Sequence, residues 1–117
     1  MTQVVWERAP GSSLMRMTAS GHSGYAAEGS DIICAAVSAA MALLDRNLTE
    51  LGARRGGRCG DGYQMVEGAG WTAWKLMRVT AEFLRALAYQ YPDFINFTEK
   101  NLDFDAEWGE MPPNTGL

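Results

Sequence analysis

The chain has 117 residues, a formal net charge of −4 and a pI of about 4.9. This length predicts a single domain, and the acidic balance argues against direct binding to nucleic acids, whose protein partners are usually basic. Two cysteines are too few for a disulfide scaffold, no secretory leader is recognisable, and the longest apolar run, 32–44, is shorter than the ~20 residues of a membrane span. We therefore expect a cytoplasmic protein that binds neither nucleic acid nor a membrane.

A β-hairpin is predicted at the beginning of the chain. Residues 2–8 and 14–19 alternate apolar and polar side chains, with Val4 and Trp6 on one face of the first strand. A proline, a glycine and a serine within 9–12 supply the turn. The two strands are therefore expected to pair with each other.

A long helix is predicted over about 31–51, where Asp31 can cap the first turn and Gly52 can end the last. Its first half is apolar nearly all round, which is typical of a buried helix. Its second half narrows to one apolar stripe: Leu44, Leu48 and Leu51.

A second hairpin and a second helix are predicted next. The strands are expected at 54–59 and 63–67, around a turn at Asp61-Gly62. The helix is expected over about 71–91, with apolar side chains at helical spacing. Thr72 is a possible cap at its start, and Pro92 cannot continue it.

A last strand is predicted at 94–98, before an acidic, proline-containing segment. Two hairpins, two helices and this strand predict an α+β fold, a two-layer domain with two helices packed on a small, mostly antiparallel sheet. We expect residues 1–100 to form this domain and residues 101–117 to be a flexible acidic tail.

One segment carries residues capable of catalysis. His22 is the only histidine and lies in a loop spaced by Gly21, Gly24 and Gly29, and Cys34 lies at the start of the long helix, twelve residues later. A thiol is a useful nucleophile only as the thiolate, which a helix N-terminus and a nearby histidine both favour. Taken singly, a cysteine on an apolar helix is usually a packing residue, and a loop histidine is usually a surface residue.

The run GHSGYAAEGSDIICAAVS, from Gly21 to Ser38, resembles the signature of the ribosomal-processing cysteine proteases (the Prp, or YsxB-like, family). Order, spacing and residue types agree along this run, and the likeness extends at pattern level over about residues 2–98. Two positions depart from the family pattern: Ser23 replaces the usual alanine, and Ala26 the usual glycine.

The resemblance implies a cysteine endopeptidase that removes a short N-terminal extension from a bacterial large-subunit ribosomal protein, acts as a homodimer and needs no cofactor or metal. The family's catalytic pair falls on His22 and Cys34, and its other motif positions fall on Gly21, Asp31 and Ser38. A phage or prophage relative that cuts capsid or scaffold proteins would use the same chemistry.

The residues themselves suggest a role for each member of the motif. Cys34 is the candidate nucleophile, His22 the base and later the acid, and the N–H groups of the first helical turn could hold the oxyanion. Asp31 could be a helix cap or could orient His22. Ser38, one turn beyond Cys34, could bond near the thiol or back to the Cys34 carbonyl.

The loop over 20–29 is the predicted substrate loop, with Ser23, Gly24, Tyr25 and Gly29 as candidate peptide contacts. Three glycines with one bulky apolar side chain, Tyr25, predict few contacts to hold the loop. We therefore expect it to close when a peptide binds.

Other interpretations remain open. A non-catalytic adaptor of the same fold would need neither His22 nor Cys34, and a redox sensor would need a second cysteine near the first. A zinc site formed by His22, Cys34 and Cys59 lacks paired ligand spacing, and Cys59 is taken as a packing residue. Three large side chains, Trp71, Trp74 and Phe83, could anchor a dimer, although we expect at least two of them in the core.

Overall fold

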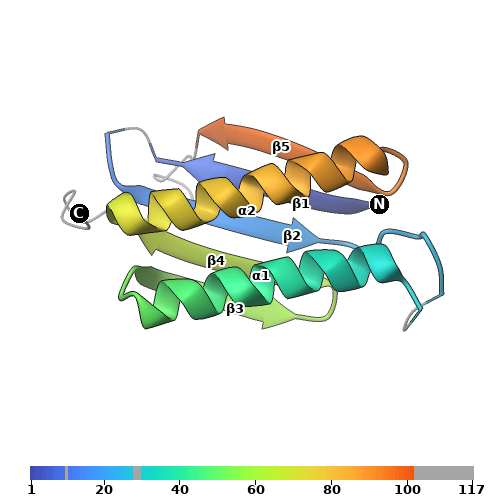
Figure 1. The fold of residues 1–117 in the computed structure, drawn as a ribbon, viewed down its shortest axis with the longest axis horizontal. Helices are drawn as coiled ribbons and strands as arrows, with labels where there is room; N and C mark the ends of the chain where they lie inside the picture. Colours follow the sequence, from blue (N-terminus) through green and yellow to red (C-terminus); the bar gives the residue numbers. More distant parts are fainter. Residues whose placement is uncertain (10, 28–29, 102–117) are drawn as a thin grey trace.

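The computed structural model describes residues 1–9, 11–27 and 30–101, so Gly29 and the predicted tail from residue 102 onward lie outside the described part. Five strands and two helices follow one another along the chain (Figure 1): β1 (Thr2–Arg8), β2 (Leu14–Ser20), α1 (Ile32–Glu50), β3 (Arg54–Gly60), β4 (Tyr63–Ala69), α2 (Gly70–Gln90) and β5 (Ile95–Asn101).

The strands form a single sheet in the order β3-β4-β2-β1-β5. The pairs β1–β2, β2–β4 and β3–β4 are antiparallel, and β5 is parallel to β1, with Thr2 opposite Ile95. Both predicted hairpins are confirmed, and the last strand runs three residues beyond its predicted end at Thr98. The expected α+β fold is therefore confirmed.

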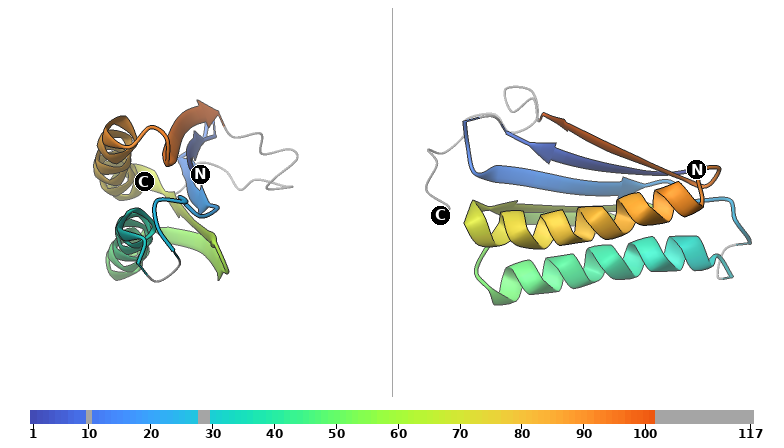
Figure 2. Two further views of the ribbon diagram at one scale, coloured as in Figure 1. Left: turned by 90° about the vertical axis from the view of Figure 1, so that its right-hand side faces the viewer. Right: turned by 45° about the horizontal axis from the view of Figure 1, so that its top comes forward.

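The two helices lie side by side and antiparallel on one face of the sheet (Figures 1 and 2). The core lies between the layers, because each strand turns alternate side chains toward the helices. Val4 and Trp6 share one face of β1, as predicted, and both are buried there with Met17 of β2. The helices contribute one buried stripe each: Ile33, Val37, Met41, Leu44 and Leu48 from α1, and Gly70, Ala73, Met77, Ala81 and Leu84 from α2.

The prediction that the first half of α1 is buried all round is wrong. Ile32 is 60% exposed, and Ala35, Ser38 and Ala39 are exposed as well. Leu51, predicted in the apolar stripe with Leu44 and Leu48, lies past the helix end and is 60% exposed. In a two-layer fold a helix is covered only where it meets the sheet and its neighbouring helix, so its outer face stays open whatever its composition. By length and composition alone α1 could cross a bilayer, but its buried stripe packs in the domain core.

The start of α2 also differs from its prediction. β4 continues through Ala69 and passes directly into the helix, whose N-cap is Ala69 without a side-chain bond, so Thr72 is not the cap. Gly70 has a φ of +92°, which a glycine adopts without strain at this strand-to-helix junction. Trp71 and Phe83 are 59% and 50% exposed, so the expectation that at least two of the three large aromatic residues lie in the core is wrong.

Candidate active site

The site lies at the end of the sheet where β2 leaves for the loop and α1 begins. Gly21 fixes the start of this loop: its N–H donates to the Gly62 carbonyl at 2.8 Å, and its carbonyl accepts from Thr2 Oγ1 at 3.2 Å. Its φ is +83°, and a Cβ there would lie 2.8 Å from the Met1 carbonyl oxygen. Glycine at this motif position is therefore required both by its backbone angle and by the close approach of the N-terminus.

The fold brings the predicted pair to the same place. His22 and Cys34 both line two adjoining cavities of about 300 and 200 Å³. Cys34 is partly buried, and its Sγ accepts the backbone N–H of Ser23 at 3.2 Å. Because Ser23 follows His22 in the chain, this contact ties the histidine-bearing loop directly to the thiol. A hydrogen-bond donor at the sulfur favours the thiolate.

The turn between β3 and β4 is a part of the site that the sequence analysis missed. Gly62 has a φ of +66°, and a Cβ on it would lie 3.2 Å from His22 Nε2. Gly62 and Tyr63 line the smaller cavity together with the histidine and the cysteine. Asp61-Gly62 was recognisable only as a turn, since its contact with His22 depends on the pairing of β4 with β2.

Asp31 is the cap of α1, as one of its two interpretations predicts. Its Oδ1 accepts the N–H groups of Ile33 and Cys34, both at 3.0 Å, and its Oδ2 accepts the Ser23 hydroxyl. The Ser23 bond, aided by those from Cys34 and opposed by desolvation, lowers the pKa of the Asp31 carboxyl from 3.8 to about 2. No bond between Asp31 and His22 occurs within the described residues, so the orienting interpretation gains no support.

The capping bonds occupy most of the N–H groups that were expected to hold the oxyanion. The N–H groups of Ile33 and Cys34 are occupied by the Asp31 carboxylate, and that of Ala35 by the Asp31 carbonyl at 3.1 Å. Those donors are therefore not free for a substrate oxygen. Ser38 lines both cavities, and in the described part of the chain its hydroxyl makes no hydrogen bond, to the Cys34 carbonyl or elsewhere.

The described part of the substrate loop is better anchored than its glycine content suggests. Ser23 is only 3% exposed, and its Oγ accepts the Tyr25 N–H at 3.1 Å while donating to Asp31. The Tyr25 ring packs edge-on against Tyr91 and Phe94, with centroid separations of 6.0 and 5.2 Å. Gly24 is exposed at a φ of +77°, with open space around it.

Cys59 lies on the edge strand β3 and is exposed, so its expected packing role is wrong. Residues 1–9, 11–27 and 30–101 contain no cluster of three potential metal ligands, so the zinc alternative built on Cys59 finds no support there.

Comparison with known proteins then assigns the chain to a family. The sequence profile described as "Cysteine protease Prp" matches residues 1–96, most of the chain. The chain belongs to the Prp cysteine protease family. It is therefore a cysteine protease, and the resemblance seen in the motif is confirmed over nearly the whole described domain.

Solved structures of similar fold include Prp proteins. The essential ribosomal processing protease Prp from S. aureus, in complex with a covalently linked product peptide, is 20% identical with a TM-score of 0.74, over 86% of this chain and 100% of that one. The same enzyme with a substrate peptide is 19% identical with a TM-score of 0.69, over the same shares. SMU.848 from Streptococcus mutans is 23% identical with a TM-score of 0.65, over 87% and 96%. No curated protein sequence gives a significant match.

Proposed function

We propose that this Prp-family protein is an endopeptidase that removes an N-terminal extension from a bacterial large-subunit ribosomal protein in the cytoplasm, with Cys34 as nucleophile and His22 as base and acid. The residue assignment rests on the contact between the His22 loop and the thiol. The backbone N–H of Ser23, the residue after His22, donates to Cys34 Sγ, and His22 and Cys34 line the same cavity. A fold similar to that of a ribosomal processing protease supports the substrate class.

The chemistry follows from these positions. His22 takes the thiol proton, the Cys34 thiolate attacks the peptide carbonyl, and His22 returns the proton to the leaving amine. Water then hydrolyses the thioester. The field of a helix terminus is worth only about 0.3–1 kcal/mol, less than the ~1.4 kcal/mol of one pKa unit. In this proposal the Ser23 N–H, which donates to Cys34 Sγ, and a protonated His22 supply the remaining stabilisation of the attacking thiolate.

The charge of the enzyme suits such a substrate. Ribosomal proteins bind RNA and are accordingly basic, whereas this chain carries a net charge of −4. Complementary charge of this kind accelerates encounter more than it adds affinity. Cleavage should consequently slow as the salt concentration rises.

The test is cleavage of peptides that span the N-terminal extensions of bacterial large-subunit ribosomal proteins, compared with peptides from phage capsid and scaffold proteins. Cys34→Ala should abolish cleavage and lower the melting temperature only modestly, because it removes one sulfur and the bond that this sulfur accepts from the Ser23 N–H. Cys59→Ala, the matched control on an exposed cysteine, should cleave normally. Retained activity of Cys34→Ala would reject the assignment, and wild-type binding without cleavage would instead support an adaptor.

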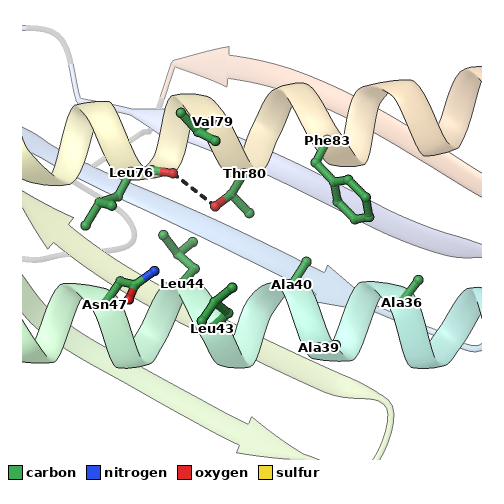
Figure 3. Close-up of a pocket in the computed structure, with 10 residues that line it drawn as sticks. All are labelled: Ala36, Ala39, Ala40, Leu43, Leu44, Asn47, Leu76, Val79, Thr80 and Phe83. Carbon is green, nitrogen blue, oxygen red and sulfur yellow. Dashed lines mark hydrogen bonds between the residues drawn. The ribbon is translucent and has the colours of Figure 1, made fainter.

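We also propose that the protein is a homodimer joined through the outer face of its two helices. A groove of about 480 Å³ lies between α1 and α2 (Figure 3). Leu43 from α1 and Phe83 from α2 line it, and the Thr80 hydroxyl turns back to donate to the Leu76 carbonyl at 3.0 Å. The groove is therefore almost wholly apolar, bordered by exposed side chains that could fill the same groove on a second copy.

The size of this face fits a dimer. Two neighbouring helices of 19 and 21 residues, each ~30 Å long and ~10 Å wide, present a face of ~20 Å by ~30 Å. Its area of about 600 Å² is close to the ~800 Å² per partner of a standard interface. Leu43→Glu should convert the dimer to a monomer in sedimentation experiments. Leu51→Glu should leave the protein dimeric, because Leu51, at the end of α1, is about as exposed as Leu43 but does not line the groove. A monomeric wild type at micromolar concentration would reject the proposal.

A further inference from the structure

Ser23 is buried beside the thiol at 3% exposed, and both its hydroxyl and its backbone N–H are hydrogen-bonded. Its side chain donates to the Asp31 carboxylate and accepts the Tyr25 N–H, while its backbone N–H donates to Cys34 Sγ. A buried hydroxyl is costly to desolvate unless it is bonded in this way. One residue therefore joins the loop, the cap of α1 and the candidate nucleophile.

We propose that Ser23 is a positioning residue of the active site. Its hydroxyl fixes the loop to the Asp31 cap, and this holds its own N–H against Cys34 Sγ and sets the place of its neighbour His22 before a substrate arrives. The inference rests on the proposed function for its catalytic meaning, whereas its effect on the thiol can be measured without any substrate.

The hydroxyl acts on the sulfur through the backbone, because its bond to Asp31 holds the Ser23 N–H at Cys34 Sγ. A hydrogen-bond donor at the sulfur stabilises the charged form of the thiol. The titratable groups that line the two cavities with Cys34 are His22 from the loop, Asp31 before α1 and Tyr63 from β4. Only Asp31 among them is bonded to Ser23.

Removal of the hydroxyl gives the test. In a Cys59→Ser background, Ser23→Ala should slow alkylation of Cys34 by iodoacetamide about tenfold at pH 7 and move its pH profile upward by about one unit. In cleavage assays kcat should fall by a similar factor, with KM nearly unchanged, because the change acts on the thiol and not on peptide binding.

Ser12→Ala is a matched control. Ser12 Oγ accepts the Leu14 N–H at 3.2 Å, the same two-residue spacing as the bond from Tyr25 to Ser23, in a turn away from the site. In Ser12→Ala the pH profile of Cys34 alkylation should equal that of the parent protein. A Ser23→Ala profile that also equals the parent profile would overturn the proposal, even if the protein cleaves peptides normally.

The outcomes separate the positioning role from the proposed function. A shifted thiol profile in a protein that cleaves no ribosomal peptide would support the role of Ser23 and reject the function. Should Ser23→Ala fail to fold, hydrogen exchange of the Ser23 amide in the wild-type protein decides: slow exchange supports the bond to Cys34, and exchange at the rate of a free peptide rejects it.

Discussion

Gly62→Ala should impair catalysis by moving His22, although Gly62 takes no part in the chemistry. The new methyl would lie 3.2 Å from His22 Nε2, so the imidazole must retreat by a few tenths of an ångström. A misplacement of 1 Å can cost about a hundredfold, so this shift should lower kcat/KM by about four- to tenfold. The φ of +66° also disfavours alanine by about 1 kcal/mol.

Gly52→Ala separates the two effects. Gly52 has a φ of +71° with nothing near its missing side chain, so alanine there carries the same backbone strain and touches no site residue. Both variants should melt about 4 °C below the wild type, the shift expected from about 1 kcal/mol in a chain of this length. Peptide cleavage should fall only for Gly62→Ala. Equal kcat/KM for the two variants would refute the argument that Gly62 sets the position of the imidazole.

Three further predictions concern stability. Gly21→Ala should destabilise more than Gly52→Ala, by over ~2 kcal/mol in urea unfolding, because its Cβ meets the Met1 carbonyl oxygen at 2.8 Å in addition to the backbone strain. The pKa of the Asp31 carboxyl is lowered in the folded protein, so its contribution to stability is complete above pH 3.8 and is lost as the pH falls toward about 2. The melting temperature of the wild type should therefore fall over this pH range, and that of Asp31→Asn should fall less. Leu84→Ala should cost about 2–5 kcal/mol, since Leu84 is fully buried.

Local patterns were enough to predict the elements and the motif. The bounds of β1 were predicted to the residue, and those of α1 and β2 to within one residue, because alternation and helical spacing are properties of neighbouring side chains. The proximity of His22 and Cys34 was also predictable, since a twelve-residue separation allows one loop to connect them. Family membership followed from the same short run of sequence.

The tertiary structure decided which surfaces are covered and which residues complete the site. Composition predicted a buried α1, but whether Leu43 is exposed depends on how many layers the domain has. Gly62 reaches His22 only because β4 pairs with β2, and Ser23 is buried only because the loop folds back onto Asp31 and Cys34. The sequence by itself therefore determined the elements and the chemistry of the candidate pair. The contacts that hold this pair in place form between segments distant in the chain, and only the packed fold determines them.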